Sequence, residues 1–409
     1  MKNNEKSLKQ RAKTLIGVMT LIITFTVPQN VIAVQQIQGE VIGESILAEM
    51  TLEEKVAQMF FITPEALTEV NLVTEAGNTT EAAFSEYPVG GIIYFGQNME
   101  SREQVSAMLR RMQDISEKQI NIPIFLATDE EGGRVSRLYG GAITDIPYVG
   151  DMYSVGKSED SSEAYQVGRT IGSYMKELNF NVDFAPVADI YSNPENTVIG
   201  DRAFGSTAEL VSEMVPMAVK GLQSEGVLAT LKHFPGHGDT ADDSHNGYAS
   251  SYKTMEELEQ CEFLPFYAGI QSNVAFVMMG HISLPNVLDD ETPASLSYEI
   301  VTEILREKLQ FNGIIITDAL NMGAIAQNYS SGEAAVMAVE AGVDMLLMPA
   351  DFKTAYETLI NSVQEGRISE ERINESVLRI LQTKRKMKKM NYKDEEETEK
   401  CIAEIVEQN

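Results

Sequence analysis

The stretch VLATLKHFPGHGDTADDSH, residues 227–245, joins an apolar run to a segment rich in groups that handle protons. It holds three of the four histidines in the chain. Residues 227–231 are apolar with a β-branched character, which predicts a buried strand, and Pro235 with the glycines on either side of His237 excludes a helix after it. Histidine changes charge near neutral pH, and aspartate commonly orients it. We therefore expect chemistry on a loop at the end of a buried strand.

Further apolar runs of similar length alternate with longer amphipathic stretches along the chain. The expected strands are, besides 227–231, residues 59–63, 89–95, 123–128, 181–187, 274–279, 313–317 and 343–348. Eight strands alternating with helices predict an α/β fold with parallel strands. The count favours a closed (β/α)8 barrel of the TIM type, irregular in its first strands, over an open doubly wound sheet. No glycine-rich nucleotide fingerprint follows the first strand, so no cofactor is predicted.

Helix signals lie between these runs. A capping box at 51–54 predicts one helix, and residues 206–209 cap another in which Pro216 should produce a kink. The last helix, from about Ser369, places four apolar residues on one face: Ile373, Val377, Ile380 and Leu381. The basic run 384–389 predicts a solvated helix end, and residues 391–409 a charged tail.

The amino-acid composition and the net charge limit the class to which the protein can belong. The 409 residues are 43% hydrophobic, enough for one large core, and residues 45–390 are assigned to a single catalytic domain. The net charge of −29 disfavours nucleic acid and anionic membranes as partners. Two cysteines give neither a disulfide framework nor a zinc-type spacing.

The first 33 residues have the pattern of a targeting signal. Basic residues are followed by an apolar run from Thr14 to Val27 and by small residues near Ala33, as in an export signal. An uncleaved N-terminal anchor is the alternative, and it would be the only contact with a membrane. We expect a monomer that is exported to the extracellular space or the cell surface.

Polar residues follow five of the expected strands, where a TIM barrel places its catalytic groups. They are Asp129 to Arg134 after the third strand, Asp183 and Asp189 after the fourth, the histidine-rich segment after the fifth, His281 after the sixth and Asp318 after the seventh. Simpler interpretations stay open for most of them. Asp318 could cap the next helix, Asp129 could form a salt-bridge cluster with Arg134 and Arg137, and His281 could be a hydrogen-bonded histidine at a strand end. Asp183 and Asp189 are interpreted as structural.

The histidine-rich segment has two chemical interpretations. Its histidines and aspartates (His233, His237, Asp239, Asp243 and His245) could bind a metal, but Pro235 and Gly236 remove the helix that would align two histidines four residues apart, and no metal site is predicted. Alternatively, Asp243 and His245 lie two apart and point to the same side of an extended segment. Asp243 can then hold His245 in one tautomer and stabilise its protonated form, as the aspartate of a catalytic triad does.

These motifs resemble those of the β-N-acetylglucosaminidases of glycoside hydrolase family 3. The resemblance is carried by KHFPGHG (232–238) with DSH (243–245), and by DEEGGRVSR (129–137), NFNVDFAP (179–186), VIGDRAFG (198–205) and TDALNM (317–322). It extends from about residue 45 to about residue 390. The histidine segment distinguishes this branch from the β-glucosidases of the family, which take a glutamate acid/base from a second domain.

The resemblance implies a retaining exo-β-N-acetylglucosaminidase that acts on peptidoglycan fragments or amino-sugar oligosaccharides through a covalent glycosyl-enzyme. It implies that Asp318 is the nucleophile and that His245, paired with Asp243, is the acid/base. It also implies five sugar-binding residues: Asp129, Arg137, Arg202, Lys232 and His233. A β-N-acetylglucosaminide phosphorylase is the alternative enzyme, because an imidazole lacks the negative charge that would repel phosphate. An inactive N-acetylglucosamine-binding protein is the alternative from another class.

Overall fold

The computed structural model describes residues 43–240 and 249–391. The expected export segment 1–33 and the tail beyond Asn391 lie outside the described residues. Eight short strands form one parallel sheet in the order β10-β1-β2-β3-β4-β5-β7-β9. Their bounds are β1 (Phe60–Ile62), β2 (Gly91–Ile93), β3 (Phe125–Thr128), β4 (Val182–Asp183), β5 (Leu228–Phe234), β7 (Phe276–Met279), β9 (Ile314–Thr317) and β10 (Leu346–Leu347).

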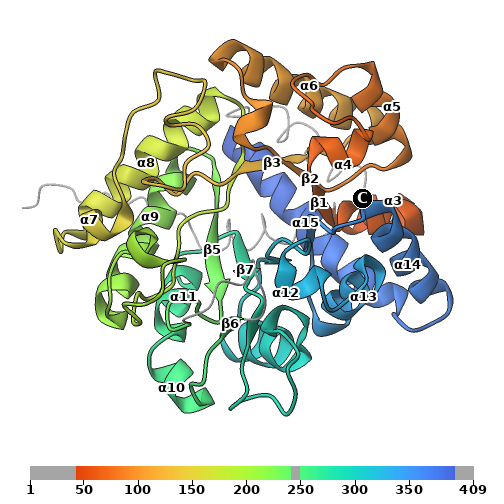
Figure 1. Cartoon of the computed structure of the whole chain (residues 1–409). Helices are drawn as coiled ribbons and strands as arrows, with labels where there is room; N and C mark the ends of the chain where they lie inside the picture. The colour runs from red at the N-terminus through yellow and green to blue at the C-terminus, as the bar shows by residue number, and fades with distance from the viewer. Residues whose placement is uncertain (1–42, 241–248, 392–409) are drawn as a thin grey trace, which may run out of the picture. The chain divides into compact units, whose positions relative to one another are not determined.

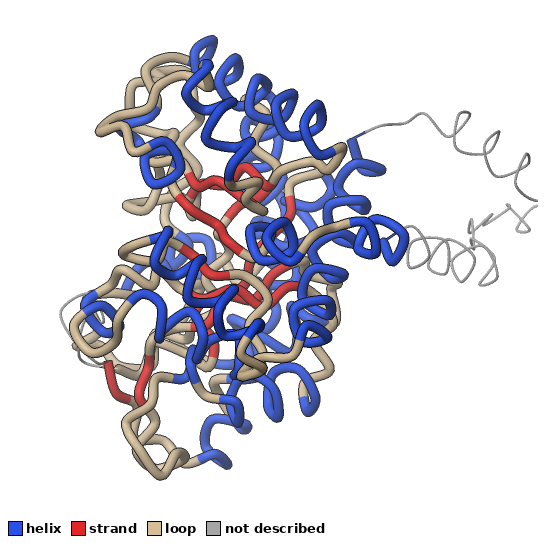
Figure 2. Tube along the Cα trace, turned by 90° about the vertical axis from the view of Figure 1, so that its right-hand side faces the viewer, coloured by secondary structure: helices blue, strands red, loops and turns tan. Residues whose placement is uncertain are grey.

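The two edges of this sheet meet. Ile316 of β9 forms a parallel bridge with Met345, next to β10. In addition, the Thr317 N–H donates to the Met345 carbonyl at 3.1 Å, and the Leu347 N–H donates to Thr317 Oγ1 at 3.0 Å. The strands therefore form a ring that follows chain order, and Figures 1 and 2 show helices around it. The predicted (β/α)8 barrel is confirmed.

The helices lie between successive strands or flank the ends of the barrel. They are α3 (Leu52–Gln58), α4 (Pro64–Thr68), α5 (Asn78–Glu86), α6 (Arg102–Ile120), α7 (Met152–Gly156), α8 (Ser161–Glu177), α9 (Ala208–Ser224), α10 (Met255–Gln260), α11 (Phe263–Ile270), the π-helix η4 (Glu299–Lys308), α12 (Gly323–Ala326), α13 (Ser331–Ala341), α14 (Phe352–Gln364) and α15 (Glu370–Asn391). Short 3₁₀ turns occur at η1 (Gly96–Asn98), η2 (Gly200–Arg202) and η3 (Ala294–Leu296). Within the described ranges, no helix is long and apolar enough to cross a membrane.

Two short strands form a separate parallel pair outside the ring. They are β6 (Ala249–Ser250) and β8 (Ile282–Ser283). The pair joins the segment before α10 to the segment that follows β7.

All eight expected strands are present, but β5 is longer than predicted. It continues through Lys232 and His233 to Phe234, so the expectation that these two residues lie on a loop is wrong. After an irregularity in register that begins at Leu231, Phe234 still pairs with Met279 of β7. Strand pairing therefore continues up to Pro235, which lacks the N–H that would extend it.

Two expectations concern residues inside the helices α9 and α15. The helix α9 contains Pro216 and continues to Ser224, so the proline does not end it. In α15 the four apolar residues are buried as predicted, but Lys384 is 1% exposed rather than solvated. Its Nζ donates to Gln58 Oε1 at 2.7 Å and lies 5.1 Å from the centroid of the Phe125 ring. Burial lowers the pKa of Lys384 well below its usual range.

Aromatic side chains fill the middle of the ring. Phe61 contacts Phe125 and Phe184, with ring centroids 6.4 and 5.2 Å apart, and Phe125 contacts Phe276 at 5.2 Å. Such edge-to-face and offset contacts stabilise a packed interior. This aromatic layer separates the N-terminal ends of the strands from the C-terminal ends, where Phe184 also lines a cavity.

Candidate active site

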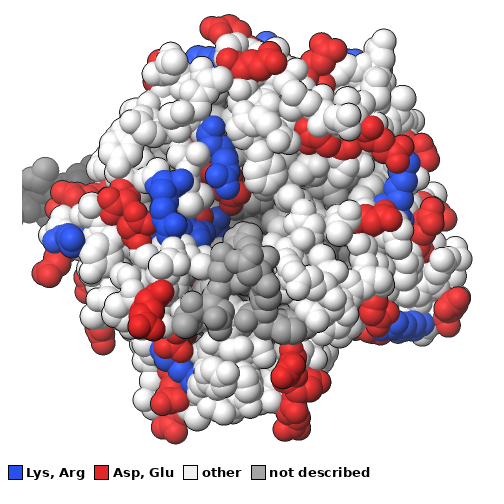
Figure 3. All heavy atoms as spheres, in the orientation of Figure 1, with Lys and Arg blue, Asp and Glu red and all other residues white. Residues whose placement is uncertain are grey.

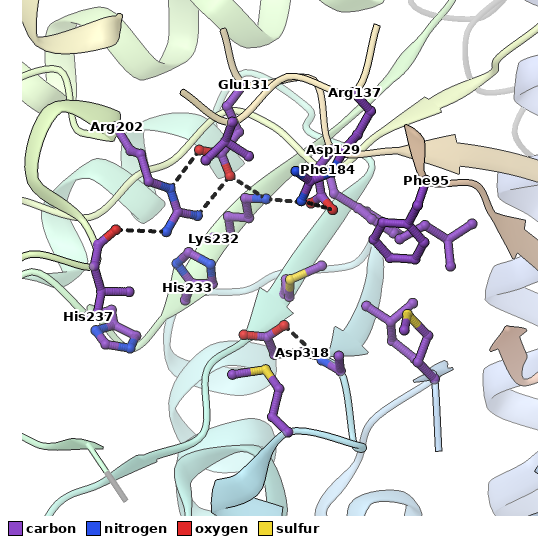
Figure 4. Close-up of a pocket in the computed structure, with 18 of the residues that line it drawn as sticks. Phe95, Asp129, Glu131, Arg137, Phe184, Arg202, Lys232, His233, His237 and Asp318 are labelled. Atoms are coloured by element: carbon purple, nitrogen blue, oxygen red, sulfur yellow. Dashed lines mark hydrogen bonds and ion pairs between the residues drawn. The ribbon is translucent and has the colours of Figure 1, made fainter. Parts of the chain in front are cut away.

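A cavity of about 340 Å³ lies at the C-terminal ends of the barrel strands. Figure 3 shows basic and acidic side chains beside a hollow in this face, and Figure 4 shows the residues that line it. Its polar lining comprises Asp129, Glu131, Arg137, Arg202, Lys232, His233, His237, Asp318 and Asn321. Its apolar lining includes Ile93, Phe95, Phe184, Met278, Met322, Leu347 and Met348.

A chain of ion pairs forms the polar wall. Lys232 Nζ, from β5, lies 2.9 Å from Asp129 Oδ1 and 2.6 Å from Glu131 Oε1. The Arg202 guanidinium donates to both oxygens of Glu131, at 2.7 and 2.8 Å. Burial opposes ionisation of Glu131, but the charges of Arg202 and Lys232 hold its pKa below the usual range. The pKa of Lys232 is raised because Asp129 and Glu131 outweigh the effect of its burial.

Arg137 is held less tightly than the other two cations of the cavity. Its guanidinium lies 3.6 Å from Asp129 Oδ2 and 5.7 Å from the centroid of the Phe95 ring. Its Nε is buried and has no hydrogen-bond partner among the described residues. Among the described residues its guanidinium thus makes one long ion pair, so fewer contacts hold Arg137 than hold Arg202 or Lys232.

The charges that line the described part of the cavity cancel. Asp129, Glu131 and Asp318 contribute three negative charges, and Arg137, Arg202 and Lys232 contribute three positive ones. A neutral ligand with many hydroxyl groups suits such a wall, because each hydroxyl both donates and accepts hydrogen bonds.

Asp318 directly follows β9, as predicted. Its N–H donates to the Met279 carbonyl at 2.8 Å, and its Oδ1 accepts from the Ala319 N–H at 2.7 Å. Burial raises its pKa, but His233, His281, the Ala319 N–H and Lys232 together lower it below its usual value. Asp318 is therefore ionised at neutral pH.

The alternative that Asp318 caps the next helix is wrong. The helix α12 begins at Gly323, and Met322 occupies its N-cap. The side chain of Asp318 is one of the groups that line the cavity instead.

His233 is oriented by Asp189, a carboxylate interpreted above as structural. Asp189 is 0% exposed, and its Oδ2 lies 2.7 Å from His233 Nδ1. Asp189 also accepts from the backbone N–H of His233 and from that of His237, the latter at 2.7 Å. Because an ionised carboxylate only accepts hydrogen bonds, His233 Nδ1 carries a proton and Nε2 is the nitrogen left for other contacts.

His237 also lines the cavity. Its Nδ1 lies 2.8 Å from Thr240 Oγ1, and its ring centroid is 5.8 Å from that of His233. Within residues 43–240 and 249–391, no group of three or more histidine, cysteine, aspartate or glutamate residues could hold a metal ion. Asp243 and His245, the expected acid/base pair, lie outside the described residues.

The remaining candidates lie around the cavity. Both ring nitrogens of His281 have partners, Ser295 Oγ at 2.8 Å and the Ala319 carbonyl at 3.1 Å, which agrees with the simpler interpretation of this histidine. Arg134 does not join Asp129; it binds Asp201 and three carbonyls of residues 197–199. Asp183 is buried, and burial raises its pKa well above the usual range.

Two side chains have contacts at the site that were not predicted from the sequence: Glu131, which was not singled out, and Asp189, which was interpreted as structural. Glu131 could have been found, since it lies two residues after Asp129 and side chains two apart in an extended segment share a side. The position of Asp189 after the fourth strand was recognised, but its pairing with His233 carries no local signal, because the two residues are 44 apart in the chain.

Known proteins that are similar to this chain include two curated proteins and one solved structure. Beta-hexosaminidase A of Pseudoalteromonas piscicida is 32% identical over 327 residues, which cover 74% of this chain and 54% of that protein. A beta-hexosaminidase of Nitrosomonas eutropha is 34% identical over 298 residues, covering 71% and 82%. The structure of a glycoside hydrolase family 3 beta-N-acetylglucosaminidase from Paenibacillus sp. str. FPU-7 shares 39% identity with a TM-score of 0.78, covering 84% of this chain and 64% of that one.

The chain thus spans about half the length of the Pseudoalteromonas protein and just under two thirds of the Paenibacillus one. A family model, the glycosyl hydrolase family 3 N-terminal domain, matches residues 51–383. That range begins at the N-cap of α3, ends within α15 and includes every strand of the barrel. The chain belongs to glycosyl hydrolase family 3.

Proposed function

We propose that this chain is a retaining exo-β-N-acetylglucosaminidase, which removes terminal β-linked N-acetylglucosamine. The observation that carries the proposal is an ionised Asp318 in a cavity whose charges cancel, opposite a wall of fixed donors and acceptors. The names of the three similar proteins support the same activity.

In the proposed mechanism, Asp318 attacks the anomeric carbon and forms an ester bond to it. The bond from that carbon to the leaving oxygen breaks, and His245, paired with Asp243, supplies the proton that this oxygen takes up. Water then attacks the anomeric carbon while His245 accepts a proton from it, and Asp318 is released. The low pKa of Asp318 suits a nucleophile that must be ionised when substrate arrives.

The ion-paired wall would bind the sugar hydroxyls. Asp129, Glu131, Lys232 and Arg202 hold one another in place before substrate binds, so little side-chain entropy is lost on binding. His233 adds one ring nitrogen with a defined proton state. Arg137, with its unpartnered Nε, suits a substrate carbonyl or hydroxyl oxygen.

The proposal extends to the setting of the reaction. Peptidoglycan fragments or amino-sugar oligosaccharides are the proposed substrates, and the proposed location is outside the cell, because residues 1–33 have the pattern of an export signal. We propose that the protein acts as a monomer.

The test uses purified protein with a chromogenic β-N-acetylglucosaminide and the matching β-glucoside. We expect cleavage of the first substrate only, at a rate indifferent to phosphate and to a chelator. Asp318→Asn should reduce turnover by about three orders of magnitude or more with an unchanged circular dichroism spectrum.

Three results would contradict the proposal. Retained activity in Asp318→Asn would remove the nucleophile. N-acetylglucosamine 1-phosphate formed only with phosphate would identify a phosphorylase. Binding of N-acetylglucosamine without cleavage of either substrate would identify a binding protein.

A further inference from the structure

Two tyrosines form an exposed aromatic pair on the segment between β3 and α7. Tyr139 is 40% exposed and Tyr148 is 60% exposed. Their ring centroids are 4.8 Å apart, with an angle of 40° between the ring planes. Apolar surface that is exposed beside polar groups commonly marks a site of binding.

The two tyrosines are exposed although the segment that carries them is firmly held. Between them in the chain, Ile143 and Ile146 are 3% and 5% exposed, and Leu138 next to Tyr139 is fully buried. Asp145 forms an ion pair with Arg102 of α6 at 3.0 Å. The segment is thus anchored by its aliphatic residues, and the tyrosines are left out of the core.

A buried carboxylate sets the position of Tyr139. Glu130 Oε2 accepts from the N–H groups of Arg137 and Leu138, at 2.8 and 3.0 Å. Glu130 Oε1 accepts from Ser136 Oγ at 2.6 Å, and this same oxygen of Ser136 accepts from the Tyr139 N–H at 2.9 Å. These bonds fix a turn in which Arg137 lines the cavity while Tyr139 faces solvent.

Tyr148 lies at the other end of the segment and contacts Tyr139. Its neighbour Val149 packs against Gly132, where an added Cβ would lie 3.0 Å from Val149 Cγ2 and 2.9 Å from the Gly150 carbonyl oxygen. Gly132 has a φ of +90° and directly follows Glu131 of the cavity wall. Tyr139 is thus two residues from Arg137 of the cavity lining, and Tyr148 is next to Val149, which contacts the residue that follows Glu131.

We propose that Tyr139 and Tyr148 form a saccharide-binding subsite for the sugar units that follow the cleaved bond. This inference rests on the proposed function and extends it from the terminal sugar to the rest of the substrate. A pyranose presents a face of C–H bonds, and the negative face of an aromatic ring attracts such weakly positive hydrogens.

The distance along the chain fits that role. Two residues of extended backbone span at most about 7 Å, so the Tyr139 backbone lies close to that of Arg137, whose side chain is in the cavity. Tyrosine also loses little conformational freedom on binding, which suits an exposed contact surface. A glycan leaving the cavity on this side would meet the pair next.

The test compares two substrates of the purified full chain. One is the β-1,4-linked tetramer of N-acetylglucosamine, which leaves three sugar units beyond the cleaved bond. The other is trifluoroethyl β-N-acetylglucosaminide, whose leaving group contains no ring. In the double variant Tyr139→Ala/Tyr148→Ala, we expect kcat/KM for the tetramer to fall about five- to tenfold, mainly through KM, with less than a twofold change for the trifluoroethyl substrate.

Matched variants separate stacking from folding. Tyr139→Phe/Tyr148→Phe should keep the wild-type ratio of the two kcat/KM values, because the rings are retained. Tyr298→Ala, which removes a 55% exposed tyrosine at the start of η4, should leave both substrates unaffected. An equal loss for both substrates, or no loss for the tetramer, would overturn the proposal.

A failure of the proposed function gives a different result. If the wild-type chain cleaves neither substrate, tetramer affinity is measured by calorimetry on the wild-type chain and on the double alanine variant. A five- to tenfold weaker affinity in the variant would still support a saccharide subsite. Equal affinity, or no binding to the wild-type chain, would overturn it.

Discussion

At the scale of single residues, Asp189 decides which nitrogen of His233 faces the cavity. We predict that Asp189→Asn disturbs this choice, because an amide group offers its NH2 as readily as its oxygen to His233 Nδ1. The chain has only four histidines, so nitrogen-15 labelling of histidine allows the tautomer of His233 to be followed by NMR. We expect the Nδ1–H signal of the wild-type protein to be lost and KM to rise about tenfold or more.

A purely structural role for Asp189 would change the melting temperature and kcat/KM in a different way. Asp189 also accepts from the His237 N–H, so the melting temperature is measured alongside. In a His233→Ala background, Asp189→Asn should add little to the loss of kcat/KM, since the two residues act as a unit. Additive losses would contradict the prediction.

Asp183 gives a second prediction at this scale. Burial raises its pKa above the unfolded value, so the folded protein binds a proton that the unfolded chain releases above about pH 4. Stability therefore decreases as pH rises past that point. Asp183→Asn keeps the side-chain shape and the oxygen that accepts from the Glu130 N–H. Because the amide does not ionise, it does not lose stability in this way as the pH rises.

We accordingly expect Asp183→Asn to have a larger free energy of unfolding than wild type at pH 7. The gain should shrink as the pH is lowered toward 4. Urea denaturation at several pH values measures it, and a gain that is constant with pH would contradict the assignment of a protonated Asp183.

The sequence could predict part of the site for a physical reason. Parallel strands place their C-terminal ends together, so Asp129, Lys232 and Asp318 could be assigned to one face before any contact was known. Contacts between side chains on different strands were not predictable in this way. The ion pairs of Glu131 and the bond from Asp189 to His233 depend on which side chains meet across the ring.

At the scale of elements, α8 and α9 pack at unusually close range through glycines. A Cβ added at Gly168 would lie 2.4 Å from the Ala218 carbonyl oxygen, and one added at Gly221 would lie 2.3 Å from that of Tyr165. Real Cβ atoms do not approach oxygen so closely, so the helices would have to separate. We predict that Gly168→Ala lowers the free energy of unfolding by about 1 to 3 kcal/mol, although alanine favours a helix over glycine.

The matched control is Gln166→Ala on the exposed side of the same helix. It should change stability by less than about 0.5 kcal/mol. Chemical denaturation of both variants measures the difference, and an unchanged or higher stability in Gly168→Ala would contradict the close contact.

Element boundaries were harder to predict than element types. Composition ends β5 at Leu231, but pairing with β7 extends it to Phe234. The charge run at 384–389 predicts a solvated surface, yet α15 places Lys384 against Gln58 and Phe125. Both differences arise from neighbouring elements, which local patterns do not describe.

At the scale of the whole molecule, Asp344 ties the last strands of the barrel to its outer helices. It is 0% exposed and accepts from Arg306 of η4 at 2.6 Å, from Ser376 and Arg379 of α15 at 2.8 and 3.0 Å, and from the Ile315 N–H of β9 at 2.9 Å. Removal of this carboxylate would leave buried arginine charge without compensation. We predict that Asp344→Ala lowers the free energy of unfolding by about 3 to 5 kcal/mol.

The pH dependence of the stability lost in Asp344→Ala tests whether the charge of the carboxylate is the cause. Burial raises the pKa of Asp344, but Arg306, Arg379 and Arg372 hold it below the unfolded value. Its stabilisation is thus present above about pH 4 and is lost as the pH falls through the folded-state pKa. The difference in free energy of unfolding between wild type and Asp344→Ala should therefore become smaller in acid. The control is Asp351→Ala, which removes the N-cap of α14 and should lower the free energy of unfolding by only about 1 kcal/mol.

The balance of charge in the cavity contrasts with the net charge of −29 carried by the chain. At physiological ionic strength, interactions between exposed charges are largely screened beyond a Debye length of about 8 Å, and this length grows as salt is removed, so the net charge acts on an approaching molecule mainly at low salt. The association rate of an uncharged glycan should therefore be nearly independent of ionic strength. An anionic ligand must cross a repulsive field, so its association should become faster as salt is added. Of the two proposed substrate classes, uncharged amino-sugar oligosaccharides should therefore associate faster at low salt than peptidoglycan fragments, which carry carboxylates.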